Sequence, residues 1–164
     1  MTKKKPAAGP GAPALAPEIR PGQSIELLKE LHILTREGKL NQDSRRKLKQ
    51  VYHLFQFIEK ILQELQASKA SEGGLTLADH GAGKSYLGFI IYDLYFKAQK
   101  TGHIYGIETR AELVQKSREL AARLGFDRMS FLPLSVADAT QSDALPAHID
   151  VVTALHACDT ATDD

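Results

Sequence analysis

The feature that most constrains this chain is a glycine-containing loop between a predicted strand and a predicted buried helix. The loop reads Asp79-His80-Gly81-Ala82-Gly83-Lys84-Ser85. An apolar run over residues 75–78 precedes it, and a helix predicted over residues 84–99 follows it, apolar on nearly every side. Glycines let the backbone turn sharply, and a helix N-terminus offers free N–H groups and a partial positive charge. This arrangement predicts a site for a nucleotide-like ligand.

Strand and helix patterns alternate along the second half of the chain. The predicted strands cover residues 75–78, 103–107, 129–136 and 149–155, and the predicted helices cover residues 84–99 and 111–124. Pro133 indicates an edge strand or a bulge, because proline cannot donate to a strand ladder. The alternation predicts an α/β fold with a Rossmann-like parallel sheet of about four strands.

The first 70 residues have a different pattern. Residues 1–22 hold five of the seven prolines, which predicts a disordered Pro/Ala-rich tail. Residues 23–70 predict a helical cap, with one helix from Ser24 to about Gly38 and a longer one over residues 42–67. The apolar stripe of the longer helix comprises Leu48, Val51, Leu54, Phe55, Ile58, Ile61, Leu62 and Leu65. We expect this stripe to pack against the domain predicted over residues 71–164.

Charge is distributed unevenly, although the formal net charge is only +1. Residues 1–50 carry a net charge of +6, and the remaining residues carry −5. The basic part could attract a polyanion such as RNA through Arg45, Arg46, Lys47 and Lys49. The alternative is a tail and a helix face that are simply solvated.

Composition excludes several classes of protein. A chain of 164 residues suits one domain, and its longest apolar-rich stretch falls short of the roughly 20 residues that span a bilayer. Prolines interrupt the N-terminal segment too often for a signal peptide, and one cysteine cannot form an internal disulfide. No His/Cys spacing matches a metal site. We therefore expect a cytoplasmic protein without a membrane segment or a bound metal.

The glycine segment has features of two kinds of nucleotide-binding loop. Gly83-Lys84-Ser85 matches the end of a phosphate-binding P-loop, but the glycine expected five residues earlier is replaced by Ala78 within the strand. The loop is therefore too short to wrap a phosphate. A Rossmann-like nucleotide site needs instead an acid after the second strand, and Glu108 stands there, 25 residues after Gly83. Its carboxylate can accept hydrogen bonds from both ribose hydroxyls.

Two further residues favour S-adenosyl-L-methionine (SAM) over a nicotinamide dinucleotide. The dinucleotide motif places a third glycine on the helix for close packing, where this chain has Tyr86. Asp79 before the loop would repel a pyrophosphate, whereas its carboxylate suits the ammonium group of SAM.

These residues resemble the class I SAM-dependent methyltransferases. Leu-Ala-Asp-His-Gly-Ala-Gly-Lys-Ser is similar to the first SAM motif and Tyr-Gly-Ile-Glu to the second. The stretch from Leu155 to Asp163, Leu-His-Ala-Cys-Asp-Thr-Ala-Thr-Asp, is similar to one subgroup of these methyltransferase domains, in which Phe or Val usually replaces His80. That subgroup includes bacterial proteins of unassigned substrate and the methyltransferase part of a eukaryotic glutathione S-transferase C-terminal-like protein. The resemblance covers residues 75–164.

The resemblance also implies roles for individual residues. The methionine moiety of SAM would be lined by Asp79, Gly81 and Gly83, and the ribose would be bound by Glu108. The adenine would be contacted by Ala137 and Asp138. The transferred methyl group would be faced by His156 and Asp159. His156 would act as a base or contact the substrate, or else be a hydrogen-bonded histidine at a strand end. Asp159 would assist His156 in this role, or its side chain would cap the N-terminus of the next helix. Cys158 is expected to be a packing residue.

The family's sheet normally has seven strands, and this chain supplies four. We therefore interpret the chain as an N-terminal part of a longer methyltransferase or as a natural truncation. The expected function is methyl transfer from SAM to an unidentified acceptor, with RNA among the candidates. The alternative is a truncated, non-catalytic Rossmann-like fragment that binds a nucleotide or RNA.

Overall fold

The structure is a computed structural model that describes residues 16–69 and 73–154. Four parallel strands form one sheet in the order β3-β2-β1-β4. Their bounds are Thr76–His80 for β1, His103–Ile107 for β2, Met129–Leu132 for β3 and Val151–Thr153 for β4. The predicted Rossmann-like parallel sheet is thereby confirmed, and β3, the strand before Pro133, lies at an edge.

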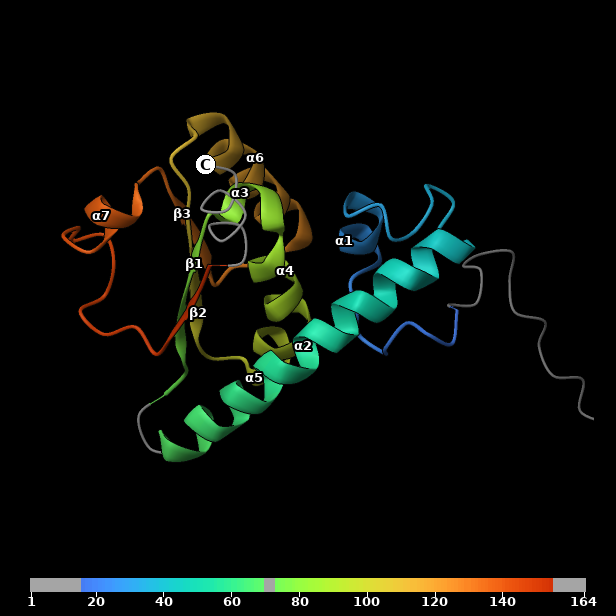
Figure 1. The fold of residues 1–164 in the computed structure, drawn as a ribbon, viewed down its shortest axis with the longest axis horizontal. Helices are drawn as coiled ribbons and strands as arrows, with labels where there is room; N and C mark the ends of the chain where they lie inside the picture. The colour runs from blue at the N-terminus through green and yellow to red at the C-terminus, as the bar shows by residue number, and fades with distance from the viewer. Residues whose placement is uncertain (1–15, 70–72, 155–164) are drawn as a thin grey trace, which may run out of the picture.

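Helices cover the two faces of the sheet unequally (Figure 1). The connections from β1 to β2 and from β2 to β3 lie on one face; they include α4 (Leu87–Ile91) and α6 (Ala111–Leu124). The connection from β3 to β4 lies on the other face, with the short helix α7 (Val136–Ala139). Crossovers keep one hand, so reversing the direction of strand addition moves the connection to the opposite face.

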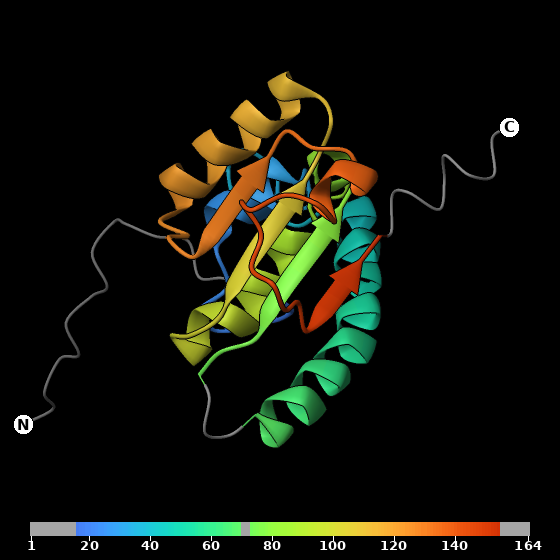
Figure 2. The same cartoon turned by 90° about the vertical axis from the view of Figure 1, so that its left-hand side faces the viewer.

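The strand order therefore reverses between β1 and β4. Figure 2 shows β4 beside β1, on the side of β1 that is away from β2 and β3. In open α/β sheets, ligands bind outside the carboxyl ends of the strands at such a reversal. The register places Asp79, near the end of β1, between Gly106 of β2 and Thr153 of β4. The fold thus points to this edge of the sheet as the candidate site.

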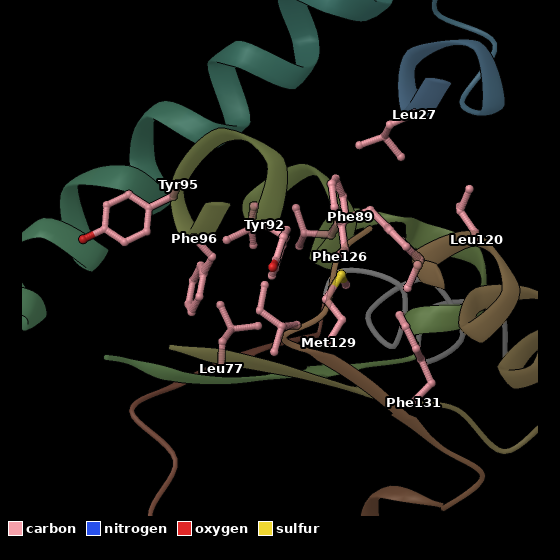
Figure 3. Packing of buried hydrophobic residues seen from close by; sticks show 14 of the residues in the cluster. Leu27, Leu77, Phe89, Tyr92, Tyr95, Phe96, Leu120, Phe126, Met129 and Phe131 are labelled. Carbon is pink, nitrogen blue, oxygen red and sulfur yellow. The ribbon is translucent and has the colours of Figure 1, made fainter. Parts of the chain in front are cut away.

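One buried apolar cluster joins the sheet to the helices on its covered face (Figure 3). Phe89 of α4 lies near its centre, with its ring 5.4 Å from that of Phe131 on β3 and 6.4 Å from that of Phe126. Phe55 and Leu62 of α2 (Gln42–Ser68) belong to the same cluster. The predicted packing of the long helix against the following domain is therefore confirmed. Ile61 is an exception, because it is 50% exposed.

The N-terminal part differs from the prediction in two respects. The first helix, α1, covers only Ile25–Glu30, and Gly38 closes a later turn with a φ of 80° rather than ending that helix. In addition, Ile19 is buried in a second apolar cluster with Leu28 and Leu48. The ordered cap therefore includes residues 16–22, which the sequence assigned to a disordered tail. The remainder of that tail, residues 1–15, lies outside the described residues.

The helix predicted over residues 84–99 is interrupted. It consists of α3 (Ala82–Ser85), α4, a π-helical segment η1 (Tyr92–Phe96) and α5 (Lys97–Gln99). Tyr86 separates α3 from α4 and adopts a left-handed conformation, with a φ of 51°. Such backbone costs about 1–3 kcal/mol and persists where the surroundings compensate. Here the Tyr86 ring packs 6.0 Å from that of Phe89.

Two predicted strands are longer than the observed ones. The third strand ends at Leu132, and Val136, which was predicted to lie in it, begins α7. The Ser135 hydroxyl accepts a hydrogen bond from the Asp138 N–H, and this N-cap favours the helical turn over continued strand. The fourth strand begins at Val151 rather than residue 149.

Asp93 of η1 links the N-terminal cap to the sheet domain. Its buried carboxylate accepts hydrogen bonds from the Ser24 N–H, at 3.1 and 3.0 Å, and forms an ion pair with Lys97. We expect Asp93→Asn to lower the free energy of unfolding by about 1–3 kcal/mol, because a buried charge-assisted contact is lost. Urea denaturation measures the change. The exposed Asp43→Asn variant is the control; an equal effect of the two substitutions would contradict a special role for Asp93.

Candidate functional site

Asp79 lies near the carboxyl end of β1 at the reversal point of the sheet. Its side chain is almost fully buried, and the Thr153 hydroxyl of β4 donates a hydrogen bond to Oδ1 over 2.8 Å. A buried carboxyl group is thus held at the start of the glycine loop, between β1 and β4. Thr153 was not predicted, although a threonine near the end of the fourth predicted strand is visible in the sequence.

The two glycines of the loop have different roles. Gly81 adopts a left-handed conformation with a φ of 73°, and its N–H donates to the Ile107 carbonyl over 2.8 Å, which ties the loop to the end of β2. Gly83 is buried against Glu108. A Cβ atom at Gly83 would lie 2.7 Å from Glu108 Oε1 and 2.7 Å from Leu113 Cβ. Glycine at this position lets the loop approach the carboxylate closely.

Glu108 immediately follows β2, and its side chain is only 7% exposed. Oε1 accepts from Arg110 Nη2 at 2.6 Å and from Nε at 3.1 Å, and Oε2 accepts from the Thr109 N–H at 2.8 Å. The Glu108 N–H donates to the Leu132 carbonyl at the end of β3. The carboxylate is therefore held rigidly beside the glycine loop. Arg110 was not among the predicted site residues, although a cation two residues after Glu108 is visible in the sequence.

The structure brings four of the predicted residues to one edge of the sheet: Asp79, Gly81, Gly83 and Glu108. Ala137 and Asp138 lie instead on the exposed turn α7, which follows β3. His156 and Asp159, the predicted catalytic residues, lie outside the described residues. Their roles, and the contacts of Ala137 and Asp138 with adenine, stay predictions.

A cavity of about 530 Å³ adjoins the site on the face that carries α7. Its lining is mainly apolar and includes Ala78 and His80 of β1, Ile149, and Val152 of β4. Burial lowers the pKa of His80, and Nδ1 of this imidazole is buried without a hydrogen-bond partner among the described residues. His80 is therefore held in its neutral form in the folded chain at neutral pH.

Stability should depend on pH through His80 and His103. Burial lowers the pKa of both residues, and the nearby Arg128 guanidinium lowers that of His103 further. Because the unfolded chain binds protons first, the stabilisation is full above the ordinary pKa of 6.5 and is lost as pH falls through the lowered values. We expect urea denaturation midpoints to fall between pH about 7.5 and about 5.5. His103→Gln should reduce this fall, and a slope as steep as that of the exposed-site control His53→Gln would contradict the assignment.

Two features are absent from residues 16–69 and 73–154. No helix in these ranges is long and apolar enough to cross a membrane. Nor do these residues contain a group of three or more His, Cys, Asp or Glu side chains that could hold a metal ion.

The solved structures similar to this chain include two methyltransferases, each of low overall similarity. The C-terminal domain of precorrin-6Y C5,15-methyltransferase from Rhodobacter capsulatus is 20% identical, with 53% of this chain and 44% of that chain covered and a TM-score of 0.35. A SAM-dependent methyltransferase from Aquifex aeolicus is 26% identical, with coverages of 47% and 37% and a TM-score of 0.32. The chain thus spans less than half the length of either protein. No curated protein sequence matches the chain.

A sequence model of a protein family gives the stronger comparison. The family described as a methyltransferase domain matches residues 46–164. The match begins within α2, so it reaches further toward the N-terminus than the resemblance noted from residue 75. A methyltransferase domain implies SAM as the methyl donor, the cofactor that the glycine loop and Glu108 led us to expect. Because the family model matches well over half of the residues of this chain, the chain belongs to this methyltransferase-domain family.

Proposed function

We propose that this chain binds SAM at the carboxyl edge of its sheet and takes part in transferring the methyl group to an acceptor. One observation carries the proposal: the buried carboxylate of Glu108 faces a glycine loop that leaves no room for a Cβ atom at Gly83. A rigid carboxylate beside a closely approaching glycine loop suits a ligand with a vicinal diol, because carboxylate oxygens accept hydrogen bonds from two hydroxyls.

The hydrogen bonds of Glu108 indicate how a ribose would fit. A carboxylate offers about four lone-pair sites, and Arg110 and Thr109 occupy three of them. One hydroxyl can therefore bind while Arg110 stays in place. A second hydroxyl requires Arg110, which is partly exposed, to share or leave Oε1. Arg110 would thus orient Glu108 before the ligand binds and yield part of its contact afterwards.

The charge at the other end of the site favours an ammonium over a pyrophosphate. Asp79 is buried at the strand end beneath the loop, where its carboxylate would attract a cation and repel a phosphate. Asp79, Gly81 and Gly83 would hold the methionine moiety, and Glu108 the ribose. Ala137 and Asp138 remain the predicted contacts for adenine.

When bound, SAM supplies an electrophilic methyl group on a sulfonium, which an acceptor's lone pair takes in an in-line displacement that leaves a neutral thioether. The residues of the chain provide orientation and, where the acceptor carries a proton, a base. His156 is the base we propose, and Asp159 is the second residue to which the family resemblance assigns a role near the methyl group.

Calorimetric titration of the 164-residue chain with S-adenosylhomocysteine, and separately with ATP, tests the proposal. We expect S-adenosylhomocysteine to bind and ATP to bind at least about tenfold more weakly, because Asp79 repels its phosphates. Binding of ATP alone, or of neither compound, would contradict the proposed site.

Glu108→Gln tests the ribose contact. The amide keeps one acceptor oxygen but loses the charge, so affinity for S-adenosylhomocysteine should fall about tenfold to about a hundredfold. Glu112→Gln is a matched control, because Glu112 is an exposed acid in the first turn of α6, four residues further along the chain. Equal affinities of the two variants would exclude Glu108 from the site.

A further inference from the structure

A second cavity lies on the N-terminal half of α2, away from the sheet edge. It measures about 670 Å³, and its lining combines basic and apolar side chains: Glu18, Gln42, Arg45, Arg46, Leu48, Lys49 and Tyr52. Three cations against one carboxylate leave this lining with a net charge of +2. Three of the four basic residues singled out in the sequence therefore line one cavity. The fourth, Lys47, points elsewhere and pairs with Asp43 at 3.4 Å.

The cavity is held in shape by contacts with residues 18–23. Arg45 Nε donates to Glu18 Oε1 at 3.1 Å, so the single acid of the lining is already paired. The Tyr52 hydroxyl lies 2.8 Å from the Glu18 carbonyl and 2.7 Å from Gln23 Oε1, and the Arg20 guanidinium stacks 4.6 Å from the Tyr52 ring centre. Within the described ranges no carboxylate lies in salt-bridge distance of Arg46 or Lys49. Both charges are exposed and available to an anion.

An exposed aromatic residue continues this surface along the same helix. Phe57 is 62% exposed, and the His53 ring meets its ring edge-on at 5.3 Å. Lys49, His53 and Phe57 are spaced four residues apart, so they lie one above another on one face of α2. From Arg45 to Phe57 this face runs about 18 Å along the helix axis. Basic side chains and an exposed aromatic ring thus share one surface.

We propose that this face of α2 binds single-stranded RNA, with phosphates at Arg45, Arg46 and Lys49 and a base stacked on Phe57. Basic side chains interleaved with exposed aromatic rings are the combination that single-stranded polynucleotides require, because the backbone is anionic and unpaired bases expose their faces. An acidic peptide would use the charges but not the ring. Self-association would use the ring but not the charges. The surface stands apart from the sheet edge, so the inference does not depend on SAM binding there.

Fluorescence anisotropy with a labelled single-stranded RNA of about 20 nucleotides, over a series of salt concentrations, tests the charges. Each phosphate contact contributes about 0.7 to the slope of log affinity against log salt. The triple variant Arg45→Gln, Arg46→Gln, Lys49→Gln should therefore lower the slope by about 2. The control triple Arg36→Gln, Lys39→Gln, Lys100→Gln removes the same amount of charge from exposed residues elsewhere. Its slope of log affinity against log salt should equal that of the unmodified chain. Equal losses in both triples, or salt-insensitive binding, would overturn the proposal.

Two single variants test the stacking platform. Phe57→Ala should weaken binding of the single strand about tenfold or more and leave binding of a duplex of the same length almost unchanged. Ile61→Ala removes an exposed apolar side chain from the same helix and should have little effect. If both variants instead lower the molar mass measured by light scattering and leave RNA affinity unchanged, the face is a self-association surface and the proposal is wrong.

Discussion

Gly83→Ala is expected to reduce affinity for S-adenosylhomocysteine by about a hundredfold or more while the chain remains folded. The added Cβ would lie 2.7 Å from both Glu108 Oε1 and Leu113 Cβ, so the carboxylate must move. A displaced carboxylate would lose the two hydrogen bonds that we propose it makes with the ribose. Each is worth about 1.5 kcal/mol or more when charge-assisted, and about 3 kcal/mol corresponds to a hundredfold loss of affinity. Calorimetric titration gives the affinity.

Gly88→Ala is the matched control for this substitution. Gly88 lies on the adjoining helix α4. A Cβ there would lie 3.4 Å from Ile104 Cγ2 and 3.5 Å from Asp79 Oδ2, and both are ordinary van der Waals contacts that displace neither side chain. Its affinity should stay within about threefold of the unmodified chain. If Gly83→Ala binds as well as Gly88→Ala, the glycine loop does not form the cofactor site.

Phe89→Ala is expected to lower the free energy of unfolding by about 3–5 kcal/mol. The Phe89 side chain is fully buried between the sheet and the helices, and its ring neighbours are Tyr86, Phe126 and Phe131. Deleting it leaves a cavity among aromatic rings that cannot collapse fully. Because domains are stable by only about 5–15 kcal/mol, this variant loses a large part of its stability.

Urea denaturation followed by circular dichroism measures the effect of Phe89→Ala. Phe57→Ala is the matched control, because Phe57 is 62% exposed on α2 and its removal should change the unfolding free energy by no more than about 0.5 kcal/mol. Similar losses in the two variants would mean that the cluster around Phe89 is not the core of the domain.

Local patterns in the sequence were sufficient for the α/β fold and for most of its elements. Helix α6 and strand β2 have the bounds that were expected, and α2 ends one residue later than expected. Each of these elements has apolar residues at a regular spacing and a residue that marks its end. Gly125, for example, ends α6 and adopts the left-handed conformation. The loop glycines and Glu108 could also be identified as site residues from the sequence. Their spacing along the chain depends only on the segment that connects two neighbouring strands, β1 and β2.

Patterns failed where distant residues determine the outcome. The interruption at Tyr86 depends on the packing of its ring against the core, which overrides the helical pattern of residues 84–99. Residues 16–22 are rich in proline and glycine, yet Ile19 is buried in an apolar cluster with residues of α1 and α2. Ile61 has the spacing of the apolar stripe, but it lies at the edge of that stripe and is half exposed instead of packing against the sheet domain.

The sequence by itself determined the parallel sheet, the glycine loop after β1 and Glu108 after β2, because periodicity, turn residues and spacing are local properties of the chain. Tertiary structure alone decided that Thr153 of β4 binds Asp79 and that β4 lies beside β1. It also decided how Arg110 holds Glu108 and how Arg45, Arg46 and Lys49 gather at one cavity. The Thr153–Asp79 contact and the pairing of β4 with β1 depend on strand order, which joins residues far apart in the chain and leaves no periodic signal in it. Arg110 and the basic residues of α2 are visible in the sequence, but their contacts depend on side-chain packing, such as that of Glu18 against Arg45, which no periodicity records.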